Sequence, residues 1–130
     1  MAYNESFEKK CIESLAAYCP DLEEELLGLN ERFLDLIKPF RGGGYYDSEF
    51  KGSFSIKKVL PAVCPDNPEL DYEALAISNG GMAMNAFKEM RDNSSKRNNN
   101  SIRAELFEYC RLDTYAMYAI FNKLLLIADS

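Results

Sequence analysis

Apolar side chains recur three or four positions apart in several stretches of the chain, which is the spacing of an amphipathic helix. Residues 6–18 show this pattern and are expected to form the first helix. A second stripe follows from Asp21, which precedes Glu24 by three positions, as a capping residue would. We expect this second helix to stop near Pro39, although the segment RFLDL within it could also start a short strand.

The centre of the chain carries further turn and helix signals. Glycines flank aromatic side chains in residues 41–55, which favours an irregular loop with at most one short strand. The segment SIKKVL (55–60) predicts a short helix closed before Pro65, and the second half of residues 71–90 predicts another. The side chains expected to face inward on the latter helix are Met82, Ala86, Phe87 and Met90.

Residues 91–100 are polar and of low complexity, which is typical of a mobile loop. After them, Ser101 can cap a final helix that continues to the end of the chain. The chain is therefore expected to be mostly α-helical, with at most one or two short strands. Its 130 residues, 47% of them apolar, suit a single domain over residues 1–130 with one core.

Two carboxylates stand on stripes that the rest of their helices would bury. Asp113 is in line with Tyr109 and Met117, and Glu8 is in line with Ile12. A lone buried carboxylate is costly, so each is expected to be protonated or to acquire a cation, hydrogen-bond donors or a metal. Together the two acids suggest one metal-filled pocket built from distant helices. The Tyr109 hydroxyl would point into the same pocket, where it could orient a metal-activated water.

Each acid also has an ordinary interpretation. Glu8 lies in the first turn of its helix, where free N–H groups and the helix dipole stabilise a negative charge. Asp113 could cap or kink a long helix, or pair with Arg111 or Lys123. Both interpretations stay open at the level of sequence.

Composition and charge narrow the chemistry. Histidine is absent, which excludes the usual catalytic triads and most zinc sites. The net charge of −6 argues against nucleic-acid binding driven mainly by counterion release, but it allows a nuclease whose carboxylates hold metals. The four cysteines form no paired motif and are expected to be buried reduced thiols. With no run of about 18 apolar residues and no secretory signal, we expect a cytoplasmic protein without membrane contact.

Four segments, in order along the chain, resemble the motifs of a known family. They are YNESFEKKCIESLA (3–16), ERFLDLIKPF (31–40), GSFSIKKVLPAVCP (52–65) and YCRLDTYAMYAIFNKL (109–124). They resemble a bacterial family labelled a domain of unknown function, with the motifs YN-x-x-FE, R-x-x-DL, GS-x-S-x-K-x-VLP and YC-x-x-DT. The first and last segments are similar to the second motif and the Tyr-x-x-x-Asp motif of the tyrosine subclass of DEDD 3'-5' exonucleases.

This resemblance implies a ribonuclease H-like α/β fold for the parent domain and a two-metal site, with Mg2+ or Mn2+, that hydrolyses phosphodiesters of DNA or RNA. It implies that Glu8 and Asp113 bind the metals and that Tyr109 orients the attacking water. Asn4 would support the turn of its motif or approach the substrate. Lys57 matches a family position, at which a phosphate contact and a structural ion pair are both open.

The exonuclease pattern also requires an Asp-x-Glu on a strand before its second motif, whereas the triplets of this type here come later. We therefore expect residues 1–130 to be the C-terminal portion of a nuclease-like domain without its first strands, inactive alone and able to self-associate through an uncovered apolar face. The alternative is a non-catalytic binding or scaffold module with the same fold. A third interpretation is a helical interaction domain whose basic residues Lys96, Arg97 and Arg103 contact phosphates.

Overall fold

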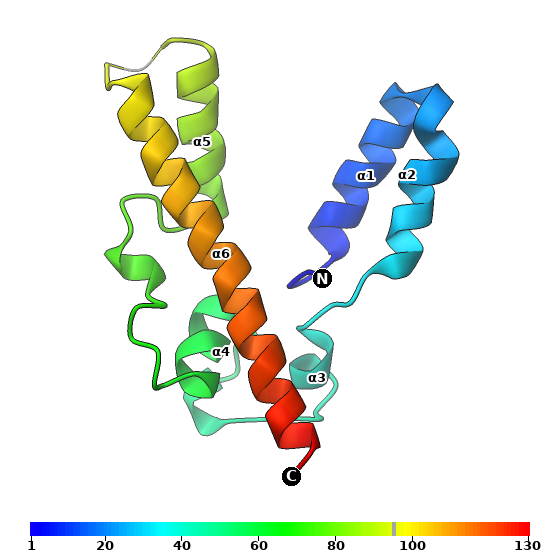
Figure 1. The fold of residues 1–130 in the computed structure, drawn as a ribbon, viewed down its shortest axis with the longest axis vertical. Helices are drawn as coiled ribbons and strands as arrows, with labels where there is room; N and C mark the ends of the chain where they lie inside the picture. Colours follow the sequence, from blue (N-terminus) through cyan, green and yellow to red (C-terminus); the bar gives the residue numbers. More distant parts are fainter. Residues whose placement is uncertain (95) are drawn as a thin grey trace. The chain divides into compact units, whose positions relative to one another are not determined.

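The computed structural model describes residues 1–94 and 96–130, and most of these residues are helical (Figure 1). The chain divides into two compact units, Met1–Ser48 and Glu49–Ser130. Strand pairing in the described part of the chain is limited to an isolated parallel bridge in the first unit. The prediction of a mostly helical chain with almost no strand is therefore confirmed. The ribonuclease H-like parent fold and the single domain over residues 1–130 stay predictions.

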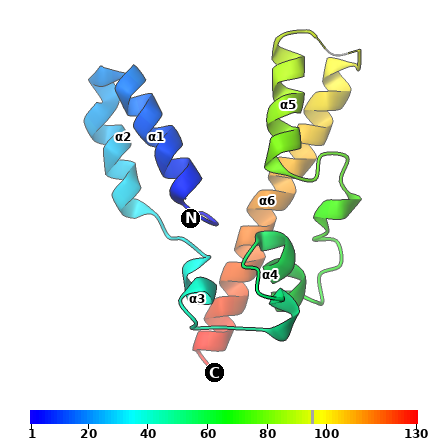
Figure 2. The ribbon, with the colours of Figure 1, turned by 180° about the vertical axis from the view of Figure 1, so that it is seen from behind.

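The first unit contains a hairpin of two helices, α1 (Ser6–Tyr18) and α2 (Glu23–Leu29), which lie side by side in both views (Figure 1, Figure 2). The helix predicted over residues 6–18 is thus confirmed. A 3-10 turn, η1 (Pro20–Leu22), joins the two helices. Proline fits the first position of this turn because its missing N–H has no partner to lose there.

The predicted second helix is wrong at both ends. It begins at Glu23 with Leu22 as its N-cap, whereas Asp21, the predicted cap, lies within η1. It ends at Leu29, and a 3-10 turn, η2 (Asn30–Arg32), then leads to the extended backbone of Phe33. The alternative that the segment RFLDL starts a short strand is therefore closer to the structure than a helix continued to Pro39, although the pairing found is a single isolated bridge at Asp35.

A buried carboxylate, Asp35, explains why the chain becomes extended at this point. Asp35 is 6% exposed and accepts hydrogen bonds from the backbone N–H groups of Asn4 (2.7 Å), Glu5 (3.0 Å) and Ile37 (3.2 Å), while its backbone bridges to Ala2. Two of these donors lie just before α1, where no intrahelical carbonyl is available to them. Burial opposes ionisation of Asp35, but the three donors hold its pKa below the usual value for an aspartate. Asp35 therefore fixes the start of α1 from a distant segment.

The segment after Asp35 also departs from the predicted pattern. Pro39 lies in the first turn of a short helix, α3 (Lys38–Arg41), so it begins a helix instead of ending one. Residues 41–55, all of which the structure describes, contain the 3-10 turn η3 (Ser48–Phe50) and no strand. The predicted irregular loop is therefore confirmed.

The second unit is organised around α6 (Asn99–Ala128), a helix of 30 residues. It packs against α5 (Gly80–Arg91) near its beginning and against α4 (Ile56–Val63) in its later part (Figure 2). A 3-10 turn, η4 (Tyr72–Ala74), lies between α4 and α5 in the sequence. The helices predicted before Pro65, in the second half of 71–90 and at the end of the chain are therefore confirmed as elements.

The contact between α5 and α6 forms a small core. Its buried members are Ile77, Ala86 and Ile102, with Ala83, Met90, Leu106 and Tyr109 packed against them. Ala86 and Met90 face inward as predicted, whereas Met82 and Phe87 are exposed, so that part of the prediction is wrong. Asn79 caps α5 by accepting a hydrogen bond from the Met82 N–H (2.9 Å), and the helix that starts there presents Ala83 instead to the core.

The beginning of α6 differs from the prediction. Asn98, not Ser101, caps α6 by accepting a hydrogen bond from the Asn100 N–H (2.8 Å). The predicted mobile loop over 91–100 includes Ser95, which lies outside the described residues.

All four cysteines are free thiols, but only Cys64 is buried. Those at positions 11 and 110 are exposed, contrary to expectation. None of the helices in the described residues has the length and apolar character needed to cross a bilayer.

Candidate functional site

Tyr109 and Asp113 lie one turn apart on α6, and both are partly buried on the same side of that helix. Their common placement follows from their spacing of four residues. Of the apolar side chains predicted to share a face with Asp113, Ile120 is buried and Tyr109 and Met117 are partly buried, and the neighbouring Leu112 and Ala116 are buried as well. Asp113 is therefore a carboxylate at the edge of a packed helix surface.

The partner of Asp113 is Tyr72, in the turn η4. The Tyr72 hydroxyl donates a hydrogen bond to Asp113 Oδ1 at 2.6 Å, and Tyr72 is only 4% exposed. The Tyr72 ring also meets the Tyr109 ring edge to face, with 6.3 Å between centroids. Tyr72, Tyr109 and Asp113 thus form one group of side chains, which we call the tyrosine–aspartate cluster.

The sequence does not reveal Tyr72 as a member of this cluster. It is 41 residues from Asp113, in a turn without periodic pattern. The ordinary alternative of an Asp113–Arg111 pair is wrong, because the Arg111 guanidinium binds Glu108 (2.9 Å). An aromatic residue among polar ones is the signal that the sequence offers here, but it does not identify a partner.

The electrostatics of the cluster keep its phenols protonated. The pKa of Tyr72 is raised mainly by burial, and the hydrogen bond to Asp113 raises it further. Burial, followed by the nearby charge of Asp113, raises the pKa of Tyr109. Both hydroxyls are therefore available as donors at neutral pH. Among the described residues, Asp113 Oδ2 has no hydrogen-bond partner.

The Tyr109 hydroxyl lies at the beginning of α5. A Cβ atom built on Gly80 would lie 3.8 Å from it, so the hydroxyl is next to the first residue of that helix. No hydrogen bond to this hydroxyl is found among the residues that the structure describes. The phenol is therefore positioned by its ring, which packs on the α5–α6 core, while its oxygen is left available.

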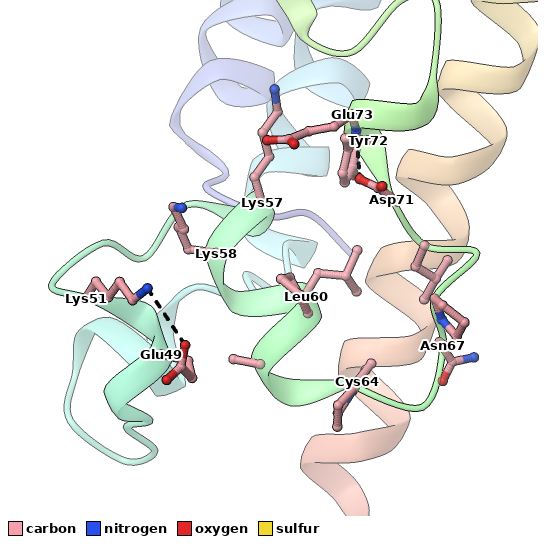
Figure 3. Close-up of a pocket in the computed structure, with 15 residues that line it drawn as sticks. Glu49, Lys51, Lys57, Lys58, Leu60, Cys64, Asn67, Asp71, Tyr72 and Glu73 are labelled. Atoms are coloured by element: carbon pink, nitrogen blue, oxygen red, sulfur yellow. Dashed lines mark hydrogen bonds and ion pairs between the residues drawn. The ribbon is translucent and has the colours of Figure 1, made fainter.

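A cavity of about 510 Å3 adjoins the cluster, because Tyr72 forms part of its wall. Lys57 and Lys58 of α4 line one side, and Glu73 follows Tyr72 on the other (Figure 3). At the rim, Lys51 pairs with Glu49 at 3.9 Å (Figure 3). Lys57 is thus exposed in a cavity of the size that small ligands occupy, roughly 300–1,000 Å3. Its role as a phosphate contact or as a partner in an ion pair stays open.

Glu8 is in the first unit, in the first turn of α1. It lines an open and mostly apolar groove of about 700 Å3 together with Phe7, Ile12, Arg32 and other residues. Its Oε2 atom is buried and has no hydrogen-bond partner within the described structure. A carboxylate oxygen in this state needs a donor or a cation to offset its lost hydration.

Asn4 stands directly before α1 in a left-handed backbone conformation, with φ of 69°. Asparagine tolerates this conformation better than most residues. Its side-chain oxygen accepts a hydrogen bond from the Ser6 hydroxyl (3.2 Å), and its N–H is held by Asp35. Asn4 is thus held at the start of α1 by these contacts, and its expected role in supporting the motif or approaching a substrate stays a prediction.

The predicted metal ligands Glu8 and Asp113 belong to different units of the chain, so their meeting at one metal stays a prediction. Within residues 1–94 and 96–130, no three His, Cys, Asp or Glu side chains are grouped so that they could hold a metal ion. Any metal site that uses these two acids therefore needs ligands beyond the groupings found in the described chain.

Comparison with known proteins finds one family that matches part of the chain. Residues 1–55 match the family described as "Domain of unknown function (DUF2779)". This match includes Asn4, Glu8 and Asp35 but not the tyrosine–aspartate cluster. No curated protein and no solved structure matches the chain. The first part of the chain is therefore similar to a family of unknown function.

Proposed function

We propose that this chain supplies part of a metal-dependent nuclease site of the DEDD tyrosine type, with Asp113 and Glu8 as metal ligands and Tyr109 beside them. The observation that carries the proposal is the pairing of Tyr109 and Asp113 one turn apart, each with an oxygen left unpartnered among the described residues. The proposal also draws on the order of the four sequence motifs. Its ribonuclease H-like parent fold is part of the same proposal.

The acids suit the chemistry of Mg2+ or Mn2+. Both ions prefer carboxylate oxygens, and Asp113 Oδ2 and the buried Oε2 of Glu8 are candidate ligands. When bound, such ions activate water and stabilise the charge that develops in phosphodiester hydrolysis. The protonated hydroxyl of Tyr109 can orient a water molecule, since its raised pKa keeps it a donor. Further carboxylates are required, because magnesium prefers six oxygen ligands and keeps only some of them as water.

The substrate class in this proposal is nucleic acid, either DNA or RNA. Lys57 is the residue we assign to a backbone phosphate, because it lines the cavity that Tyr72 shares with the cluster (Figure 3). With a net charge of −6, the chain would not bind nucleic acid through bulk charge, so local cations such as this one would determine where phosphates bind.

A non-catalytic binding or scaffold module is the second candidate function. It is favoured by the Tyr72–Asp113 hydrogen bond, which satisfies one carboxylate oxygen without any metal. In that case the cluster would be a structural link between η4 and α6. The two candidates differ in whether Asp113 is needed for chemistry.

The test uses the full-length natural chain that contains these 130 residues, which we call the full-length protein. Labelled single-stranded DNA and RNA are incubated with it in Mg2+ or Mn2+. Asp113→Asn retains an oxygen that can accept the Tyr72 hydrogen bond but removes the charge. Asp129→Asn is the matched control, because Asp129 is the exposed C-cap residue of α6. We expect cleavage that Asp113→Asn abolishes and the control retains. No cleavage by the full-length protein, or unchanged cleavage by Asp113→Asn, would refute the nuclease proposal.

A further inference from the structure

Two tyrosine rings are stacked on the surface of α6. Tyr115 and Tyr118 are three positions apart, and their ring centroids lie 6.0 Å apart with an angle of 26° between the planes. Residues with this spacing are neighbours on a helix surface. Tyr115 is 44% exposed and Tyr118 is 55% exposed, so aromatic surface stays open to solvent. We call this pair the tyrosine platform.

The tyrosine platform is separate from the tyrosine–aspartate cluster. Tyr115 follows Asp113 by two positions and Tyr118 follows it by five, so the platform rings lie on a different side of α6 from that carboxylate. The rings of Tyr72 and Tyr109 pack within the second unit instead. A substitution in the platform can therefore be made without touching the cluster.

A groove of about 210 Å3 adjoins the platform. Tyr115 and Tyr118 line it together with Asn122 and Lys123 of the same helix. Within the described chain, the Lys123 ammonium forms no ion pair and the Asn122 amide has no hydrogen-bond partner. The groove is smaller than the pockets of roughly 300–1,000 Å3 that enclose a whole small molecule. Its size therefore suits contact with one unit of a polymer.

Another wall of the groove comes from the segment after α4, with Cys64, Asp66 and Asn67. Burial raises the pKa of Cys64, so its thiol carries no charge at neutral pH. Asp66 is the one carboxylate among the described residues that line the groove, and it can accept a hydrogen bond from an N–H group on the edge of a base. Cys64 and Asn67 also line the cavity that contains Lys57, so the groove and the cavity are neighbours (Figure 3).

The groups in the groove match a base of a single-stranded nucleic acid. Every base can stack on an exposed aromatic ring, and an amide can form hydrogen bonds with a base edge. Lys123 adds one positive charge for a neighbouring phosphate. The net charge of −6 opposes binding through many phosphates, so the affinity of such a contact has to come largely from stacking.

We propose that Tyr115 and Tyr118 form a stacking site for a base of single-stranded DNA or RNA, with Lys123 at an adjacent phosphate. This inference rests on the proposed function because it takes nucleic acid as the ligand, but it requires no metal. Removing an aromatic ring on which a base stacks typically weakens binding by roughly 5–150-fold.

The experiment measures the affinity of the full-length protein for labelled strands by fluorescence anisotropy, at low salt and in EDTA so that no strand is cleaved. Oligothymidylate and oligouridylate carry bases, and a deoxyribose phosphate strand of the same length carries none. Tyr118→Ala removes one ring of the platform, whereas Tyr118→Phe keeps the ring. Phe107→Ala is the matched control, because Phe107 is an exposed aromatic residue of α6 that does not line the groove.

We expect Tyr118→Ala to weaken binding of at least one strand with bases about tenfold, and Tyr118→Phe to stay within about twofold of the unsubstituted protein. Phe107→Ala should leave the affinity unchanged. On the strand without bases, Tyr118→Ala should have no effect, because nothing stacks on the ring. Lys123→Gln should reduce the salt slope of binding by about one for strands with bases.

Several results would overturn the stacking site. They are unchanged affinity in Tyr118→Ala, equal losses on strands with and without bases, and no binding of any strand. Sedimentation of the same samples tests a second copy of the chain as the occupant. If the full-length protein is a dimer that Tyr118→Ala converts to a monomer, the rings belong to a contact between copies and the proposal is wrong.

The nuclease proposal is judged separately, by cleavage in Mg2+ or Mn2+. If Asp113→Asn abolishes cleavage while Tyr118→Ala binds strands as tightly as the unsubstituted protein, the stacking site is wrong and the nuclease proposal stands. If Tyr118→Ala loses affinity only for strands with bases and the full-length protein cleaves nothing, the stacking site stands and the nuclease proposal is wrong.

Discussion

The carboxylate of Asp35 provides the clearest test of how this chain holds its first helix. Replacing Asp35 with alanine removes the acceptor for the N–H groups of Asn4, Glu5 and Ile37. Loss of a helix cap costs up to about 2 kcal/mol, and the third hydrogen bond adds about 1 kcal/mol. We therefore expect Asp35→Ala to lower the free energy of unfolding of the first unit by roughly 3 kcal/mol.

The effect should depend on pH in a defined direction. The pKa of Asp35 is lowered in the folded chain, so its contribution to stability is present above the pKa of the unfolded chain, about 3.9. That contribution is lost as the pH falls through the folded pKa, where the carboxyl becomes protonated. The difference between Asp35→Ala and the unsubstituted chain should therefore be largest near neutral pH and shrink below about pH 4.

Native-state hydrogen exchange of the α1 amides is the suitable measurement, because it gives the free energy of the openings that expose the amides of this helix. Asp21→Ala is the control, since Asp21 is an exposed acid in η1 of the same unit and should change stability by less than about 0.5 kcal/mol. An Asp35→Ala cost no larger than that of the control, or a cost independent of pH, would refute the capping role.

Three further predictions concern the second unit. Ile102→Ala should lower the free energy of unfolding in urea by about 3 kcal/mol, because this fully buried residue joins α5 to α6. Phe107→Ala, on the exposed side of α6, should lower it much less, and equal costs would contradict the assigned core. Lys57→Gln should weaken single-strand binding and reduce its salt slope by about one, compared with the exposed Lys10→Gln; an unchanged slope would remove the phosphate contact. Tyr109→Phe should lower kcat by roughly 100-fold with Mn2+ affinity retained, and unaltered kcat would contradict its role with water.

The spacing of apolar residues predicts a helix correctly where no distant segment competes for its backbone hydrogen bonds. The periodic stretch of α1 and the positions of α4, α5 and α6 follow from apolar spacing and from the prolines and glycines around them. The second helix is wrong because Asp35 and the start of α1 form hydrogen bonds that compete with a continued α2. Such a competition depends on contacts about 30 residues apart, which periodicity does not register.

The candidate site could be predicted only in part for the same reason. Asp113 and Tyr109 share a helix, so their spacing alone brings them together. Tyr72 comes from a turn 41 residues away, and nothing in its local sequence names Asp113 as its partner. The residue that donates a hydrogen bond to Asp113 can therefore be identified only from the tertiary structure.

The proposed nuclease site requires that Glu8 and Asp113 bind the same metal ion. The most direct measurement is a double-mutant cycle of Mn2+ binding in the full-length protein, with Glu8→Gln, Asp113→Asn and both together. Glu13→Gln is the control, because Glu13 is an exposed acid on the same helix as Glu8. A shared site predicts that each single variant loses the same bound Mn2+ and that the double variant loses no more. Unchanged binding in either single variant, or separate losses that add in the double variant, would contradict the claim.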